Sequence, residues 1–293
     1  MPEEVLQEEQ QELEEEEEQA EVQVEEQQEQ VEEQQVEQEE QEDPEDYGAG
    51  GYRTVTVGEV LDNRCSTTSS PLPHLSPPPP LFTPRYLVER KLGWGAMSTV
   101  WRCRDQAAGT EVAVKVAMAD RIVTETTRDE VKLLRCVEEA PEGEGKDAVL
   151  RLLGEFEVEG AGGDRHLCLA LEMLGANLLQ CIRATTGPPA LATVAGLVEQ
   201  VLAGLDFLHT GADIIHTDIK PENLLLAGSG PVNLAGAGAR ALVVKVADLG
   251  SACWSHTQFS EVIGTREYRA PEVLLGAQYG PKVTAATITP NPP

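Results

Sequence analysis

Residues 214–226 read IIHTDIKPENLLL, and the fold is decided in this stretch. Two short apolar runs that predict strands enclose four polar residues, His216, Asp218, Lys220 and Asn223. The Asp218 carboxylate can orient a hydroxyl or accept its proton, and the Lys220 ammonium can neutralise a transferred phosphoryl group. Asn223 can offer its amide oxygen to a metal ion. The order of these residues favours phosphoryl-transfer chemistry over a purely structural polar loop.

A second carboxylate follows in the stretch VADLG, residues 246–250. Asp248 ends an apolar run that predicts a strand, and there a carboxylate can hold Mg²⁺ against phosphates. Gly250 permits the turn that comes next. A further motif, GTREYRAPE, occupies residues 264–272.

The stretch VAVKV, residues 112–116, predicts a strand whose alternate residues face opposite sides. Its three valines would face one side, and Ala113 and Lys115 the other. A lysine inside an apolar strand must reach water or an anion. Glu130 lies on the apolar stripe of a predicted helix, where an unpaired carboxylate would be costly. We therefore expect a Lys115–Glu130 pair that leaves the ammonium aimed at phosphate oxygens.

The stretch LGWGAMSTV, residues 92–100, carries Gly93 and Gly95 within a predicted strand–turn–strand. Without a Cβ atom, these glycines let backbone amides approach phosphates closely. The third small position is Ser98. Taken alone, the stretch is also compatible with an ordinary hairpin turn.

Hydrophobic periodicity places these motifs in two halves. The strand-rich half has predicted strands at 86–92, 98–104 and 111–117, a helix at 125–138, and strand-like runs over 148–172. A long amphipathic helix follows at 194–209, with an apolar stripe of Val194, Leu197, Val198, Val201, Leu202, Leu205 and Leu208. Short strands are predicted at 214–215, 224–226 and 242–247. The pattern predicts an α+β fold with two lobes and a cleft between them.

In this order, the motifs resemble those of the eukaryotic protein kinases. Six segments are similar in sequence to the serine/arginine-protein kinases (SR-protein kinases). They are EDYGAGGY, RKLGWGAMSTVW, TETTRDEVKLLRCV, QVLAGLDFLH, IIHTDIKPEN and VADLGSACW. The similarity covers residues 43–64 and 85–280. The five motifs described above occur in the same order as in that family, which makes a chance match implausible.

The resemblance implies a role for each matching residue, with ATP and Mg²⁺ as cofactors. Gly93, Gly95 and Ser98 would cover the nucleotide phosphates, while Leu92, Val100 and Ala113 pack on adenine. Lys115 would bind the α- and β-phosphates and pair with Glu130. Glu172 and Leu174 would present hinge backbone groups to adenine, behind Leu171. Asp218 would be the catalytic base and Lys220 the phosphate-neutralising lysine. Asn223 and Asp248 would hold two metal ions, and Thr265 would lie near the substrate hydroxyl.

The resemblance also implies a serine/threonine protein kinase whose substrates are basic, Arg-Ser-rich, splicing-factor-like proteins. Two other classes of function stay open. One is a catalytically inactive, kinase-like module that binds nucleotide or protein. The other is an acidic scaffold that acts through its N-terminal segment.

Three departures from the family pattern affect these expectations. Thr217 stands where most protein kinases have Arg, which predicts that phosphorylation of the activation segment is not the switch. Leu249 replaces the usual Phe after the metal-binding Asp. Residues beyond Glu272 soon lose the family pattern, so the resemblance implies a kinase truncated after its activation segment, with an incomplete helical C-lobe. We expect such a chain to fold its N-lobe better than its C-lobe and to show little or no activity alone.

Composition divides the chain further. Residues 1–46 hold 23 of the 51 acidic residues and no Lys or Arg, which predicts a disordered Glu/Gln-rich tail. Residues 65–84 are rich in Pro and Ser, which predicts a linker or insert, or else a translated intron. The remaining predicted divisions are an N-terminal extension at 47–64, an N-lobe at 85–174, a partial C-lobe at 175–280 and an irregular tail at 281–293.

The formal net charge of −29 excludes general attraction to nucleic acid or to anionic membranes. No apolar run is expected to approach the roughly 20 residues of a membrane helix. The six cysteines form no C-x-x-C pair, which favours reduced cysteines. The acidic start has no basic-then-apolar signal pattern. We therefore expect a cytoplasmic or nuclear protein.

Overall fold

The computed structural model describes residues 47, 50–66, 81–160, 162–228, 230–235, 242–257 and 262–283. Within these ranges, the side chains of 63–66 and 81–84 are not described. The predicted acidic tail and most of the Pro/Ser-rich segment therefore lie outside the described residues.

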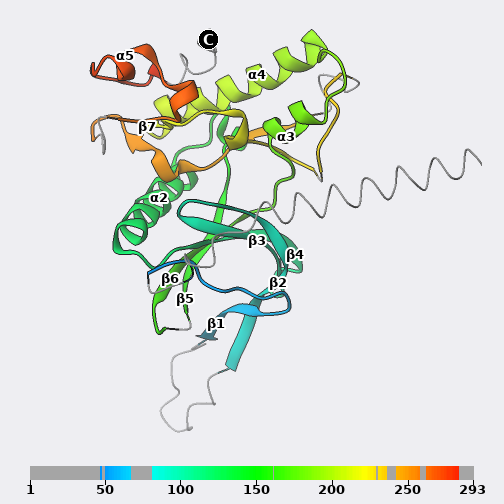
Figure 1. Cartoon of the computed structure of the whole chain (residues 1–293), viewed down its shortest axis with the longest axis vertical. Helices are drawn as coiled ribbons and strands as arrows, with labels where there is room; N and C mark the ends of the chain where they lie inside the picture. Colours follow the sequence, from blue (N-terminus) through cyan, green and yellow to red (C-terminus); the bar gives the residue numbers. More distant parts are fainter. Residues whose placement is uncertain are drawn as a thin grey trace, which may run out of the picture. The chain divides into compact units, whose positions relative to one another are not determined.

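Six antiparallel strands form the first half of the described chain (Figure 1). They are β1 (Val60–Ser66), β2 (Leu81–Gly95), β3 (Ser98–Asp105), β4 (Thr110–Ala117), β5 (Leu152–Glu159) and β6 (Arg165–Glu172). Their order across the sheet is β1-β2-β3-β4-β6-β5. β1 also contacts β5, so the sheet curls towards closure. The strands predicted at 98–104 and 111–117 match β3 and β4 to within one residue.

Strand β1 is absent from the sequence-based prediction, and β2 is longer than predicted. The two strands pair from Val60 opposite Leu87 to Ser66 opposite Leu81. Both ends of the segment 65–84, predicted to be a linker, therefore belong to this strand pair. Local sequence could not show this, because the pairing partner lies across residues 67–80, outside the described part of the chain.

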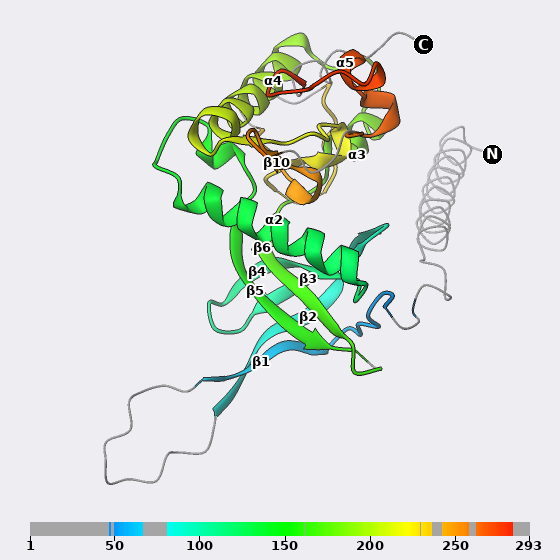
Figure 2. The same cartoon turned by 90° about the vertical axis from the view of Figure 1, so that its left-hand side faces the viewer.

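Helix α2 (Arg121–Glu139) lies against the sheet (Figure 2). The Asp120 side chain caps its start by accepting hydrogen bonds from the amides of Ile122 (2.8 Å) and Val123 (3.1 Å). The predicted apolar stripe is confirmed, since Glu130, Leu133, Leu134 and Val137 are all buried. The helix thus presents one acidic group on a mostly apolar buried face.

Strand β6 contributes to two hydrophobic clusters. Cys168 and Ala170 pack with the valines of β4 in a cluster enclosed by the curled sheet. Leu167, Leu169 and Leu171 point the other way, into a larger cluster that includes α2 and the helical half. The period of two residues in a strand produces this division. The larger cluster therefore joins the sheet to the helices.

The helical half contains α3 (Leu178–Arg183), α4 (Leu191–Asp206) and α5 (Pro271–Leu274). A π-helical turn, Phe207–Gly211, extends α4. Short strands complete this half: β7 (Ile214–Ile215), β8 (Leu224–Leu226), β9 (Val244–Val246) and β10 (Cys253–Trp254). β8 pairs with β9, and β7 pairs with β10. The predicted α+β class, with a strand-rich half before a helical half, is confirmed.

Two expectations about the long helix are wrong. Leu202, placed in the continuous apolar stripe, is 47% exposed, because the stripe is wider than the face of α4 that the core covers. Within the 21 residues Leu191–Gly211, a stretch of 18 residues has a mean hydropathy of 1.5, which meets the length and composition of a membrane-spanning helix. A core helix meets the same criteria, and Leu197, Val201 and Leu205 are buried in the larger cluster.

Removal of the α2 cap should measurably destabilise the protein. Asp120→Ala leaves two amides at the start of the helix without their side-chain acceptor. We expect the free energy of unfolding to fall by about 1 kcal/mol. Urea denaturation followed by circular dichroism measures this change. Glu125→Ala removes an exposed ion pair with Arg121 and serves as the control, because such pairs contribute about 0.5 kcal/mol or less. Equal effects of the two substitutions would contradict the capping role.

Candidate active site

The strand register brings the predicted nucleotide residues onto one face of the sheet. Gly93 lies opposite Val100, Val100 opposite Lys115, and Lys115 opposite Leu169. Residues opposite each other in neighbouring strands share a face, and so do residues two apart in one strand. Ala113 therefore joins this face, opposite Leu171. Ser98 pairs with Gly95 at the hairpin tip, and Leu92 lies at the irregularity just before Gly93.

Lys115 forms the predicted pair with Glu130 and also contacts Asp248. Its Nζ atom lies 2.9 and 3.0 Å from the two Glu130 oxygens, and 3.0 Å from Asp248 Oδ1. The side chains of Lys115 and Glu130 are 16% and 4% exposed, whereas that of Asp248 is 48% exposed. The ammonium is thus held on its buried side by one carboxylate, and the second carboxylate reaches solvent.

The charges in this group stabilise one another. Burial opposes the charge on Lys115, but Glu130 and Asp248 outweigh it and raise the pKa of the ammonium above its ordinary value. The positive charge of Lys115 lowers the pKa of Asp248 to about 2. Burial raises the pKa of the Glu130 carboxyl, against the opposing effect of Lys115. Lys115 and Asp248 are therefore both charged at neutral pH.

Gly250 fits closely against the same three side chains. A Cβ atom on this residue would lie 3.1 Å from Asp248 Oδ1, 3.5 Å from Glu130 Oε2 and 3.7 Å from Lys115 Nζ. Asp248 itself adopts a left-handed backbone conformation with φ of 63°, which is costly for a residue with a side chain. The absence of a side chain at Gly250 therefore leaves room for the ionic group.

The structure brings Asp218 and Lys220, the predicted catalytic base and phosphate-neutralising lysine, into contact with Thr265, which is predicted to lie near the substrate hydroxyl. Lys220 Nζ lies 2.9 Å from Asp218 Oδ2 and donates to Thr265 Oγ1 at 2.9 Å. The Thr265 hydroxyl and amide both donate to Asp218 Oδ1, at 2.7 and 2.8 Å. Burial opposes ionisation, but the hydrogen bonds from Lys220 and Thr265 lower the pKa of Asp218. Asp218 is therefore an ionised acceptor oriented by both neighbours.

Asn223 is oriented by its amide nitrogen, which donates to the Asp218 carbonyl at 2.8 Å. A carboxamide with its nitrogen held in this way keeps its oxygen as a candidate metal ligand. The backbone carbonyl of Asn223 accepts a hydrogen bond from the amide of Ala247, next to Asp248, at 2.9 Å. One carboxylate and one amide oxygen suit Mg²⁺, which retains waters and phosphate oxygens as its other ligands. Within the described ranges, no cluster of three or more His, Cys, Asp or Glu residues forms a separate metal site.

His216 joins the two parts of the site. Its Nε2 atom lies 2.8 Å from the Ala247 carbonyl, and its Nδ1 atom lies 3.3 Å from the Asp218 amide, which donates to it. These partners are both satisfied by a neutral ring protonated on Nε2. Burial lowers the pKa of His216, which agrees with the neutral form. The sequence placed His216 in the motif without showing this linking role.

Thr217 and Leu249 fill the positions where the sequence departs from most kinases. Thr217 has φ of 68°, and its hydroxyl donates to the Ser251 carbonyl at 2.7 Å. This hydrogen bond connects the stretch 214–226 to the segment that follows Asp248. Leu249 is 1% exposed and packs in the larger hydrophobic cluster. The prediction that phosphorylation of this segment is not the switch stays a prediction.

The predicted hinge residue Glu172 uses its side chain in a way the sequence did not predict. Its carboxylate accepts from Lys245 Nζ at 2.7 and 2.9 Å, and from the Arg151 amide at 2.9 Å. The two side chains are 20% and 11% exposed. Lys245 lies in β9, three residues before Asp248. The pair therefore connects the end of β6 to the strand that precedes Asp248. Leu174 is buried just beyond it.

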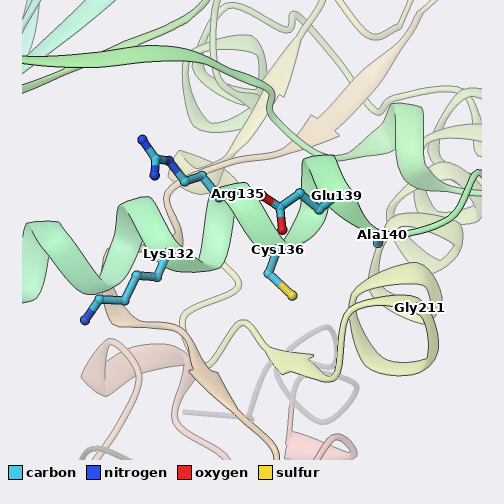
Figure 3. A pocket seen from close by; sticks show the side chains of 6 residues that line it. All are labelled: Lys132, Arg135, Cys136, Glu139, Ala140 and Gly211. Carbon is cyan, nitrogen blue, oxygen red and sulfur yellow. The ribbon is translucent and has the colours of Figure 1, made fainter.

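Two pockets described in the structure lie away from these residues. One has a volume of about 400 Å³ and is lined by Lys132, Arg135, Cys136, Glu139, Ala140 and Gly211 (Figure 3). The other, about 540 Å³, lies between α2 and the sheet and includes Asp62, Arg128, Phe156 and Leu167. Neither contains a predicted site residue. The five cysteines whose side chains the structure describes, Cys136 among them, are free thiols.

Comparison with known proteins gives consistent matches. Residues 86–285 match the sequence profile of the protein kinase domain. The chain is 34% identical over 285 residues to serine/threonine-protein kinase SRPK of Physarum polycephalum, covering 81% of this chain and 61% of that protein. It is 43% identical over 188 residues to SRSF protein kinase 3 of Homo sapiens, covering 63% and 29% respectively. Protein kinase dsk1 of Schizosaccharomyces pombe is 39% identical over 188 residues, covering 63% and 30%.

These relatives agree with the resemblance to SR-protein kinases. The chain spans about three tenths to three fifths of the length of the relatives named above. The N-terminal residues 47–85 lie before the match to the domain profile.

Substitution of Lys245 should show how much the ion pair with Glu172 contributes to the free energy of unfolding. Lys245→Met leaves the mostly buried Glu172 carboxylate without its cation, and we expect the free energy of unfolding to fall by about 1.5–3 kcal/mol. Lys245→Arg keeps the charge and is the matched control. Chemical denaturation compares the two variants. If Lys245→Met were as stable as the original chain, the pair would have no structural role.

The neutral His216 makes stability depend on pH. Because folding lowers its pKa from the ordinary value of 6.5, the unfolded chain binds the proton more readily. Stability should therefore be retained above about pH 6.5 and fall below it, by at most about 1.4 kcal/mol per pH unit for this residue. Nuclear magnetic resonance of the His216 ring between pH 7.5 and 5.5 measures its protonation directly. A ring in the folded protein that titrates near pH 6.5 would refute the assignment.

Proposed function

Since the chain belongs to the protein kinase family, we propose that it transfers the γ-phosphoryl group of ATP to a serine or threonine hydroxyl of a protein. The observation that carries this proposal is the convergence of two groups of side chains from distant parts of the sequence. Lys115, Glu130 and Asp248 form one group, and Asp218, Lys220 and Thr265 the other. His216 and Asn223 connect them through the backbone of Ala247, which immediately precedes Asp248.

Each residue then has a distinct task in phosphoryl transfer. The Lys115 ammonium, held in place by Glu130, faces the nucleotide phosphates. Asp218 accepts a hydrogen bond from the substrate hydroxyl and receives its proton, while Lys220 stabilises the charge on the transferred group. Asp248 and Asn223 would hold Mg²⁺, which neutralises phosphate charge when bound. The chain contributes chiefly by positioning and by fixed charges.

The geometry of the Asp218 group supports this assignment of roles. Thr265 already presents a hydroxyl to Asp218 at 2.7 Å, within reach of Lys220. A substrate hydroxyl needs a similar pair of contacts, one to a carboxylate and one near an ammonium. Asp218 is ionised at neutral pH, as a proton acceptor must be. We infer that the substrate serine or threonine binds beside Thr265.

We further propose that the substrates are basic, Arg-Ser-rich proteins. The likeness to SRSF protein kinase 3 supports this choice, because that protein's name refers to substrates of the SRSF class. The formal net charge of −29 also supports it, since an acidic protein attracts basic partners and accelerates their encounter. Such attraction weakens as salt is added.

The test combines nucleotide binding with phosphoryl transfer, both in Mg²⁺. Lys115→Met should weaken binding of a fluorescent ATP analogue by tenfold or more, because it removes the phosphate-facing charge. Asp218→Asn should retain binding but slow transfer of radiolabelled phosphate to an Arg-Ser peptide by about 10²–10⁴-fold. Lys132→Met, at a 62% exposed side chain on the outer face of α2, is the matched control and should change neither.

The outcomes separate the candidate functions. Transfer by the chain that Asp218→Asn abolishes supports the kinase. Binding without any transfer supports the alternative, an inactive nucleotide-binding module. If the nucleotide does not bind at all, the kinase and the nucleotide-binding module are both contradicted, and an inactive protein-binding module or an acidic scaffold becomes the better interpretation.

A further inference from the structure

A segment that precedes the match to the protein kinase domain profile packs over the strand-rich half. We call residues 50–59 the N-terminal strap. The Gly51 carbonyl accepts from the Ala119 amide at 3.2 Å, and the Gly50 amide donates to the Asp164 carboxylate at 3.3 Å. Figure 2 shows the blue segment beside the strands of the sheet. The strap is therefore part of the folded unit rather than a free extension.

The other end of the strap is held by charge and by backbone pairing. The Arg53 guanidinium donates to the Glu159 carbonyl at 3.0 Å and forms an ion pair with Glu59. The Gly58 amide donates to the Val88 carbonyl, and the Val88 amide donates to the Glu59 carbonyl. These contacts with β5 and β2 fix the direction in which the strap leaves the sheet.

Tyr52 connects this strap to the tip of the glycine-rich hairpin. Its hydroxyl donates a 2.7 Å hydrogen bond to the Gly95 carbonyl. The residue is only 6% exposed, and the ring of Tyr47 lies 5.7 Å from its own. Because the ring is buried, its orientation is fixed, and so is the position of its hydroxyl. Tyr52 therefore fixes the backbone at Gly95 from outside the hairpin.

The hairpin tip has few other constraints. Cβ atoms built on Gly93 and Gly95 would meet nothing within 4 Å, so these positions border open space. Glycine backbones lose more conformational freedom on ordering than other residues. Beyond the pairing of β3 with β2 and with β4, the tip is held by the Met118 amide, which donates to the Met97 carbonyl at 2.9 Å. Tyr52 thus supplies a second point of attachment, on the opposite arm of the turn.

The strap also reaches the start of the helix that carries Glu130. Ala119, which bonds to Gly51, immediately precedes Asp120, the N-cap of α2. One short segment therefore touches both elements that form the phosphate side of the predicted nucleotide site. Its displacement would affect the hairpin and the helix together.

We propose that Tyr52 is a positioning residue for nucleotide phosphates, acting through Gly95. Its hydroxyl holds the glycine-rich hairpin in the position in which the amides of residues 93–98 can donate to phosphate oxygens. This proposal rests on the proposed nucleotide site, and it adds a segment that lies before the match to the kinase domain. The ligand class is a nucleoside triphosphate with Mg²⁺.

Tyr52→Phe tests the proposal, because it removes the hydroxyl and retains the ring that packs in the strap. We expect amide hydrogen exchange at residues 93–99 to accelerate by about three- to tenfold, the effect of one lost hydrogen bond. The dissociation constant of a fluorescent ATP analogue with Mg²⁺ should rise by a similar factor. Where phosphoryl transfer is measurable, KM for ATP should rise and kcat should change little.

Tyr86→Phe is the matched control, since Tyr86 is also a buried tyrosine of the strand-rich half, at 1% exposure. It should leave exchange at residues 93–99 and nucleotide affinity unchanged. Unchanged exchange in Tyr52→Phe, or equal acceleration in Tyr86→Phe, would overturn the proposal. Hydrogen exchange is measured without nucleotide, so it tests whether Tyr52 holds the hairpin even if the chain binds no nucleotide. Failure to bind nucleotide would contradict the proposed function instead.

Discussion

A buried ammonium sets the arrangement on which the other features depend. Lys115 comes from the sheet, Glu130 from α2, and Asp248 from the turn that follows β9. A charge withdrawn from water is costly unless partners surround it, and the loss of one partner leaves the others uncompensated. The three elements must therefore keep their relative positions. We regard this constraint as a means of selecting one placement of α2, more than as a source of net stability.

The same constraint explains why much of the site could be predicted. A strand period of two put Lys115 on the face opposite the valines, and a helical period of 3.6 put Glu130 on a buried stripe. Each residue alone would be costly in that environment, so the pair follows from local patterns. The contact of Lys115 with Asp248 has no such origin. It depends on the left-handed turn at Asp248, which only the folded chain defines.

Other features gave no local signal. Lys245 lies in an alternating strand and has the pattern of an ordinary surface lysine, yet it reaches Glu172, far away in the sequence. Tyr52 precedes the whole sheet, and nothing near it indicates Gly95 as its partner. Strand β1 was missed because its partner follows a long Pro-rich segment. In each case the decisive neighbour is remote in sequence, so composition and periodicity could not identify it.

Strand β6 has a consequence for how the protein unfolds. Alternate residues face a cluster internal to the sheet and a cluster shared with α2, α4 and β9. Since the strand belongs to both clusters, unfolding of the helices would expose Leu167, Leu169 and Leu171 to water. The strand-rich half would then keep only one of its two apolar linings. Its autonomy is accordingly limited, and the two halves are coupled in folding by a strand of eight residues.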